Sequence, residues 1–336
     1  SVVSADSTSV VKNFSQTAAT LVTGADGTSG TFAGTLASEY TTGQLSVTKI
    51  GGGTWTLTGN SSASILSGLT VNNGVVSLNQ ATGKVGFVTT TLANGGTLTL
   101  NSGTVALSDR LGGTTSVQSQ TADRTFTNRG GTLNYYGAAG VTENLSTVTN
   151  LAGQGTWNLF NNDTQSRINI ATLSGASATN NGSLVLNAGS ALLGASASGT
   201  TAAPGAGRVN VFATTASNVV GGGGAAASKT MSIRPDIIGV DSTGTGFVVY
   251  ETTGGFRLMS ATEYQLLPTG DSGLGAVLLG STTNGSPVVT FADITGLQAG
   301  QSILAAANGI LVNATTSSPN TTLNQPKLAG PSARGP

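Results

Sequence analysis

The chain has 336 residues, of which only 8% are charged, and its 13 basic and 13 acidic side chains give a net charge of zero. An ordinary soluble domain carries about 25% charged residues, and a nucleic-acid-binding protein needs a basic surplus that this chain lacks. The sequence has no His and no Cys, which excludes disulfides, the usual zinc, haem and iron–sulfur sites, and catalysis by a His base or a Cys nucleophile. We therefore expect no cofactor.

The remaining composition predicts a folded chain. Gly supplies 50 residues, about twice its average share, while hydrophobic residues still make up 38%, enough to avoid disorder. No apolar run approaches the length of about 18 residues that a membrane-spanning helix needs. A chain of this length forms either two or three compact domains or one elongated array of repeats.

The first 44 residues carry no recognisable motif. Val2-Val3 and Val10-Val11 have the β-branched side chains that favour strands. We assign residues 1–44 to an N-terminal strand or cap, or to a segment used in assembly.

From residue 45 to residue 190 a five-residue phrase recurs. It consists of Gly, a small or β-branched residue, an apolar residue, a polar or small residue, and a second apolar residue. The copies lie at 53–57, 74–78, 96–100, 103–107, 131–135, 155–159 and 182–186. Apart from one step of 7 residues, successive copies are 21 to 28 residues apart, which is typical of solenoids. The sequence therefore predicts an all-β chain, a parallel β-solenoid of Gly- and Thr-rich rungs with a more compact β-rich C-terminal part.

Each copy alternates apolar and polar residues, which is the period of a half-buried strand. The third and fifth residues share one face of the strand, so we expect them to form the interior while Thr, Ser and Asn cover the outer face. The predicted core comprises Trp55, Leu57, Val76, Leu78, Leu98, Leu100, Leu133, Trp157, Leu159, Leu184 and Leu186. The two Trp residues hold equivalent positions and are interpreted as core rather than as sugar-stacking platforms. The leading Gly permits the turn, often at positive φ, that starts each strand.

The step of 7 residues leaves the pairing of residues 97–107 open. Asn101-Ser102-Gly103 suits a tight hairpin, and it equally suits an arc that carries one strand to the next face of a solenoid.

After the repeats the composition changes twice. Residues 191–229 are rich in Gly, Ala and Ser and predict a loop region that contains one short strand, at 208–212. Residues 230–267 concentrate charge and predict a compact charged β unit or cap, with strands at 247–250 and 256–258. The best helix candidate is 259–267, where Ser260 and Glu263 form a capping-box pattern. Residues 268–324 are assigned to a C-terminal β segment and residues 325–336 to a tail.

Two lines of the repeat are similar to a known family. Residues 49–60 read Lys-Ile-Gly-Gly-Gly-Thr-Trp-Thr-Leu-Thr-Gly-Asn, and residues 69–78 read Leu-Thr-Val-Asn-Asn-Gly-Val-Val-Ser-Leu. They resemble the opening and closing lines of the autotransporter-associated β-strand repeat, found in large repetitive bacterial surface proteins. The resemblance is strong over residues 45–110 and weaker up to about residue 265. It implies a secreted, cell-surface, right-handed parallel β-solenoid, often adhesive or structural, and the family motif carries no catalytic residues.

A polysaccharide-active solenoid enzyme needs two carboxylates about 5–10 Å apart. Asp236 and Asp241, with Arg234 nearby, form the only close acidic pair from residue 236 onward. We interpret the charges of 230–267 as a solvated face and expect no catalytic residue.

Other motifs carry weak signals. No acidic cluster suits a Ca²⁺ site, and residues 161–164 are interpreted as an Asx-rich turn. Asp109-Arg110 and Asp123-Arg124 are interpreted as local ion pairs, and the Gly run at 221–224 lacks the Lys-Ser/Thr of a phosphate loop. Candidate N-glycosylation positions are Asn13, Asn60, Asn144, Asn162, Asn181, Asn284, Asn313 and Asn320.

These features predict a non-enzymatic, extracellular, cell-surface structural protein whose main partner is itself. The open ends of a solenoid invite β pairing, and a low charge does not oppose it. We expect a subunit of a fibre or layer, joined end to end or by strand exchange, with Val2–Val11 and residues 302–313 as donors. The alternatives are an adhesin-like passenger stalk that binds cell-surface glycans and, less favoured, the polysaccharide-active enzyme.

Overall fold

The computed structural model is built from strands. It describes residues 1–61, 66–79, 85–101, 125–137, 142–161, 166–174, 182–194, 208–216, 225, 227–228, 231–251, 254–260 and 262–263, and the backbone of five later strands. All the regular elements in these residues are β-strands. Of the predicted helix at 259–267, only 259–260 and 262–263 are described, and these residues are not helical.

Two large sheets form the body of the molecule. Sheet I has 10 strands in the order β21 (Gly255–Leu258), β20 (Gly244–Glu251), β19 (Ile233–Asp241), β16 (Ser183–Asn187), β14 (Gln154–Asn161), β12 (Thr132–Gly137), β10 (Gly96–Asn101), β8 (Gly74–Leu78), β6 (Thr54–Leu57) and β3 (Gly30–Phe32). Sheet II has 9 strands in the order β17 (Leu192–Leu193), β18 (Arg208–Ala216), β15 (Ser166–Ser174), β13 (Thr142–Asn150), β11 (Thr125–Arg129), β9 (Phe87–Ala93), β7 (Leu66–Val71), β5 (Leu45–Lys49) and β2 (Ala19–Thr23).

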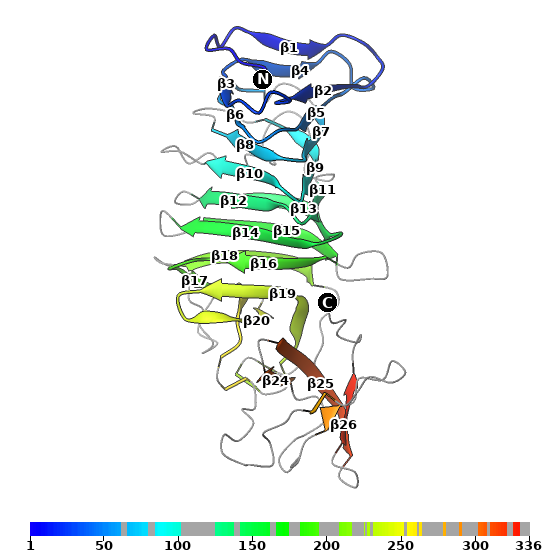
Figure 1. Ribbon diagram of the computed structural model, residues 1–336, viewed down its shortest axis with the longest axis vertical. Helices are drawn as coiled ribbons and strands as arrows, with labels where there is room; N and C mark the ends of the chain where they lie inside the picture. The colour runs from blue at the N-terminus through cyan, green and yellow to red at the C-terminus, as the bar shows by residue number, and fades with distance from the viewer. Residues whose placement is uncertain are drawn as a thin grey trace.

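The chain alternates between the two sheets, so each turn adds one strand to each of them. Pairing is parallel from β3 to β19 in sheet I and from β2 to β18 in sheet II. Figure 1 shows these strands stacked along the long axis, from the blue N-terminal end to the yellow strands β19 and β20. The predicted fold class, an all-β parallel β-solenoid, is confirmed.

The register aligns the third residue of successive phrases. Trp55 pairs with Val76, Val76 with Leu98, Leu98 with Leu133, and Leu133 with Trp157. At β16 the alignment slips by two residues, because Trp157 pairs with Leu186 rather than Leu184. A slip of two keeps every side chain on its own face, so Leu184 and Leu186 still lie in the interior. A single cluster of buried side chains runs through the solenoid from Phe32 to Phe256.

Glycines make the turns in two different ways. Gly74 has φ of +69°, and Gly95, immediately before the phrase at 96–100, has φ of +95°. The leading Gly96 is not at positive φ, but a Cβ there would lie 2.0 Å from the Val71 carbonyl oxygen. Positive φ is therefore carried either by the leading Gly or by a Gly just before it, and a leading Gly can also be required by close contact between neighbouring rungs.

The parallel stack gives way to an antiparallel unit. β19 pairs antiparallel with β20, and β20 with β21. This unit folds against β18 of sheet II: Asn210 Nδ2 donates to the Gly254 carbonyl oxygen over 2.8 Å, and a Cβ on Gly255 would lie 2.2 Å from the Val211 carbonyl oxygen. The last parallel rung is thus covered by the chain's own hairpins.

The remaining strands form small sheets. β1 (Val10–Asn13) pairs in parallel with β4 (Thr35–Ser38) near the blue end in Figure 1. β22 (Leu278–Leu279) pairs with β23 (Val289–Thr290), and β24 (Ser302–Ala307), β25 (Ile310–Asn320) and β26 (Gln325–Ala329) form an antiparallel sheet. Both strand donors expected from the sequence, at Val10–Val11 and at 302–313, therefore include strands that pair within the chain. Residues 102–107 lie outside the described residues, while β10 itself has parallel neighbours on both edges.

Candidate functional site

The charged residues of the antiparallel unit are buried, so the interpretation of this segment as a solvated face is wrong. Arg234 is 1% exposed. It donates two hydrogen bonds to Asp236, from Nε to Oδ1 over 2.7 Å and from Nη2 to Oδ2 over 2.8 Å. Sequence composition shows that charge is concentrated here but not that the charges neutralise one another in the interior. This pair lies within β19 and neutralises both charges in the interior.

Asp241, the second carboxylate of the only close acidic pair, is also fully engaged. Asp241 is the last residue of β19, directly before the turn to β20. Its Oδ1 accepts hydrogen bonds from the Thr243 N–H (2.7 Å) and hydroxyl (2.6 Å). Its Oδ2 accepts the Leu193 N–H over 3.1 Å. Neither Asp236 nor Asp241 presents a carboxylate free for acid–base chemistry.

A second buried ion cluster joins β20, β21 and the segment after them. Arg257, 2% exposed, contacts Glu251 and donates from Nη1 to Glu263 Oε2 over 2.7 Å. Glu263 also accepts the N–H groups of Ser260 and Ala227, each over 2.8 Å. Burial alone would raise the pKa of the Glu263 carboxyl, but the Arg257 guanidinium and the two N–H groups outweigh it and hold that pKa below the ordinary value of 4.5. The Ser260–Glu263 contact is one half of the predicted capping box.

Lys49 is a buried cation held only by carbonyl groups. Its Nζ donates to the carbonyl oxygens of Ile50 (2.8 Å), Gly51 (2.7 Å) and Asn73 (3.4 Å), at the turns of two successive rungs. Burial lowers the pKa of this ammonium, and the charge of Asp26 opposes that shift in part. The side chain fastens neighbouring turns and has no opening to a ligand.

The outer face of sheet I carries a ladder of amides. Asn187 Nδ2 donates to Asn158 Oδ1, and Asn158 Nδ2 donates to Asn134 Oδ1, each over 2.9 Å. Asn187 Oδ1 also accepts the Gly189 N–H over 3.0 Å. These residues occupy the fourth position of the phrase or its register equivalent, which alternation places on the outside.

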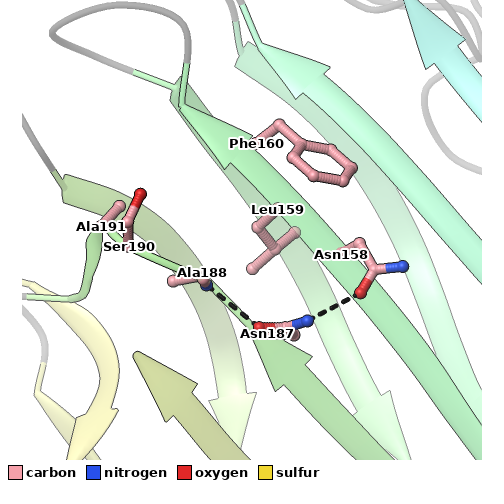
Figure 2. Close-up of a pocket in the computed structure, with 8 residues that line it drawn as sticks. Asn158, Leu159, Phe160, Asn187, Ala188, Ser190 and Ala191 are labelled. Atoms are coloured by element: carbon pink, nitrogen blue, oxygen red, sulfur yellow. Dashed lines mark hydrogen bonds between the residues drawn. The ribbon is translucent and has the colours of Figure 1, made fainter. Parts of the chain in front are cut away.

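A hollow with a volume of about 320 Å³ lies beside this ladder. Its lining residues are Asn158, Leu159, Phe160, Asn187, Ala188, Gly189, Ser190 and Ala191. Figure 2 shows the Asn158–Asn187 contact at one side, the Phe160 ring above it, and Ser190 and Ala191 from the turn that follows β16. The ring of Phe160 is stacked on Tyr136 of the neighbouring strand, with centroids 4.4 Å apart and planes 11° from parallel.

The sequence reasoning missed this aromatic pair, although a signal for it exists. Tyr136 and Phe160 each follow the fifth residue of a phrase, so alternation points both of them outward. An apolar aromatic in an outward position of two consecutive phrases is unusual for a face otherwise covered by Thr, Ser and Asn. Phe160 is indeed 40% exposed.

Most large exposed hydrophobic side chains of the described residues gather at the N-terminal end. They are Val3, Val10, Phe14, Val22 and Tyr40, and the remaining one is Phe160. Phe14, the most exposed at 72%, lies beneath the ammonium of Lys12 at 5.0 Å. β2 is the last strand of sheet II at this end, and within the described residues its outer edge has no strand partner.

The predicted core residues lie where the phrase places them. Trp55, Leu57, Val76, Leu78, Leu98, Leu133, Trp157, Leu159, Leu184 and Leu186 are all 0–2% exposed. Leu100 has a described backbone in β10, and its side chain lies outside the described residues. The two Trp residues therefore offer no surface to a sugar.

The candidate glycosylation positions fall mostly outside the described residues. Asn13 is described, and its Nδ2 donates to the carbonyl oxygens of Thr17 (2.8 Å) and Gly43 (2.9 Å), contacts that a glycan would disrupt. Asn60 is exposed. The side chains of Asn144, Asn162, Asn181, Asn284, Asn313 and Asn320 are not described, nor are Asp109-Arg110, Asp123-Arg124, residues 162–164 and the Gly run at 221–224.

The described residues hold no group of three or more Asp, Glu, His or Cys side chains arranged to bind a metal ion. Within the same residues no helix is long and apolar enough to cross a membrane. No family model, curated protein or solved structure gives a significant match to this chain.

Proposed function

We propose that this chain is a non-enzymatic structural protein of the extracellular surface, a subunit that assembles end to end into a fibre or layer. The observation that carries the proposal is the concentration of exposed apolar side chains at the N-terminal end, beside the open edge of β2. An unpaired edge strand with apolar neighbours is a site of association. The similarity of residues 45–110 to the autotransporter-associated β-strand repeat supports a surface location, and membership of that family is part of the proposal.

The structure favours end-to-end contact over strand exchange as the mode of assembly. Strand exchange requires a segment that is free to leave, whereas β1 pairs with β4 and β24 pairs with β25. The partner in the proposal is a second copy of the chain, because a net charge of zero gives two copies no long-range repulsion. At its far end sheet I finishes in β21, whose outer edge has no strand partner within the described residues. In the proposal this edge receives the second copy.

The test compares two variants by analytical ultracentrifugation and electron microscopy over a range of protein concentrations. Phe14→Ser combined with Val22→Lys places polar groups on the N-terminal end, and Phe160→Ser makes a similar change on the flank of the solenoid. We expect the unmodified chain and Phe160→Ser to form larger species as concentration rises, and the N-terminal double variant to stay monomeric. Monomers of the unmodified chain at every concentration would refute the proposal.

A further inference from the structure

The hollow beside the amide ladder is a feature that end-to-end assembly does not use. It lies on the flank of sheet I, between β14 and the turn after β16, whereas the proposed assembly surface is at the N-terminal end. Binding at this hollow does not depend on assembly.

The end of β16 creates the space. Asn158 pairs with Asn187 at the end of the β14–β16 ladder. β14 continues to Phe160 and beyond, whereas β16 ends at Asn187 and the chain turns through Gly189, which has φ of +60°. A Cβ on Gly189 would meet no atom within 4 Å, so this turn leaves its side of the hollow open.

The ring of Phe160 is held flat and accessible. Tyr136, on the β12 side, covers one face of the ring by stacking at 4.4 Å, and the hollow lies on the opposite side, towards β16. The ring keeps 40% of its surface exposed. A rigid apolar plane that faces a hollow is suited to stacking against a flat apolar surface of a ligand.

The two amides beside the ring retain hydrogen-bonding capacity. A carboxamide has two N–H donors and two acceptor lone pairs. Asn158 donates one N–H to Asn134 and accepts one hydrogen bond from Asn187. Asn187 donates one N–H to Asn158 and accepts one hydrogen bond from the Gly189 N–H. Each side chain therefore keeps one N–H and one lone pair, which matches hydroxyl groups, since a hydroxyl both donates and accepts.

The lining also limits the charge and size of a ligand. The eight lining residues that the structure describes are uncharged, so none of them offers an ion pair to a phosphate, a carboxylate or an amine. Its volume of about 320 Å³ is at the lower end of the range for small-molecule sites, about 300–1,000 Å³. A flat, partly apolar ring that carries several neutral hydroxyl groups fits all of these conditions.

We infer that this hollow binds a neutral saccharide, with a sugar ring stacked on Phe160 and its hydroxyl groups hydrogen-bonded to Asn158 and Asn187. The amide ladder alone would be a structural feature of the outer face. At Asn158 and Asn187 it lies beside the exposed ring of Phe160 and the hollow, and this combination points to the ligand class.

Saturation-transfer NMR on the purified full chain tests the inference with maltose, cellobiose, lactose and N,N′-diacetylchitobiose as probes, and with digalacturonic acid as the charged comparison. We expect at least one neutral disaccharide to give a signal, and Phe160→Ala to weaken its affinity at least about tenfold, or about 1.4 kcal/mol. Phe160→Trp should retain binding, because it retains the ring.

Matched variants separate loss of the site from loss of the fold. Tyr40→Ala removes an aromatic ring of almost equal exposure, 43% against 40%, and should leave binding unchanged. Ser190→Trp fills the hollow from its exposed rim and should abolish binding while the circular dichroism spectrum stays that of the unmodified chain. The inference fails if no neutral disaccharide binds, if digalacturonic acid binds better than all of them, or if Phe160→Ala binds as tightly as the unmodified chain.

Discussion

Trp55 and Trp157 occupy the same position of the phrase and the same column of the register, yet their indole groups have different partners. Trp55 Nε1 donates to the Val2 carbonyl oxygen over 2.7 Å. Trp157 packs edge-on against Phe126 with centroids 5.4 Å apart, and its Nε1 has no hydrogen-bond partner among the described residues. The phrase predicts burial of both residues, but not this difference, because Val2 lies 53 residues before Trp55 in the chain.

This difference predicts unequal costs for the same substitution. Trp55→Phe removes a hydrogen bond and leaves the Val2 carbonyl unpaired, whereas Trp157→Phe removes a buried donor that was already unpaired. Both variants lose similar packing volume, so the difference isolates the hydrogen bond. We expect Trp55→Phe to lower the free energy of unfolding by about 1–3 kcal/mol more than Trp157→Phe does, measured by urea denaturation. Equal losses would show that the Val2 contact contributes nothing to stability.

At the scale of strands, alternation predicts which face each residue occupies but not where a strand is placed in its sheet. The phrase correctly predicts strands at β6, β8, β10, β12, β14 and β16, because apolar third and fifth residues must be buried together. It does not predict the two-residue slip at β16, which preserves the faces, nor the change to antiparallel pairing after β19. The hollow lies where this register ends, since Asn158 and Asn187, its last pair, are both among the lining residues.

The antiparallel unit is predicted to be sensitive to acid through Glu263. Its pKa is lowered in the folded chain, so the folded state gains stability from the ionised carboxylate above the ordinary value of 4.5 and loses it as the pH falls from there through the lowered pKa. Glu263→Gln should cost about 3 kcal/mol at neutral pH, since it breaks a buried pair, and the deficit relative to the unmodified chain should shrink below pH 4.5.

Urea denaturation across this pH range measures both effects of Glu263→Gln. Glu39→Gln is the matched control, because Glu39 forms an ion pair with Lys12 at the surface and its side chain is 40% exposed. Such pairs are worth about 0–1 kcal/mol, so the control should differ little from the unmodified chain at any pH. A deficit of Glu263→Gln that stays constant at low pH would contradict the assignment of this carboxylate as ionised and stabilising.

At the scale of the molecule, part of the small number of charges lies in buried pairs. Arg234 with Asp236, and Arg257 with Glu251 and Glu263, neutralise one another inside the antiparallel unit. The described rungs are covered mostly by Thr, Ser and Asn, which hydrate without repelling a neighbouring copy. Because part of the charge is buried, the described surface carries less charge than the overall percentage of charged residues suggests.

This distribution predicts that the proposed assembly is insensitive to ionic strength. Raising the salt concentration from about 0.01 M to about 1 M shortens the Debye length from about 30 Å to about 3 Å and would weaken any association driven by opposite charges. If apolar contact and backbone pairing at the N-terminal end drive association, light scattering should show similar assembly at both extremes, and the Phe14→Ser, Val22→Lys variant should remain monomeric at both. Dissolution of the assemblies by salt would instead identify surface charge as the driving force.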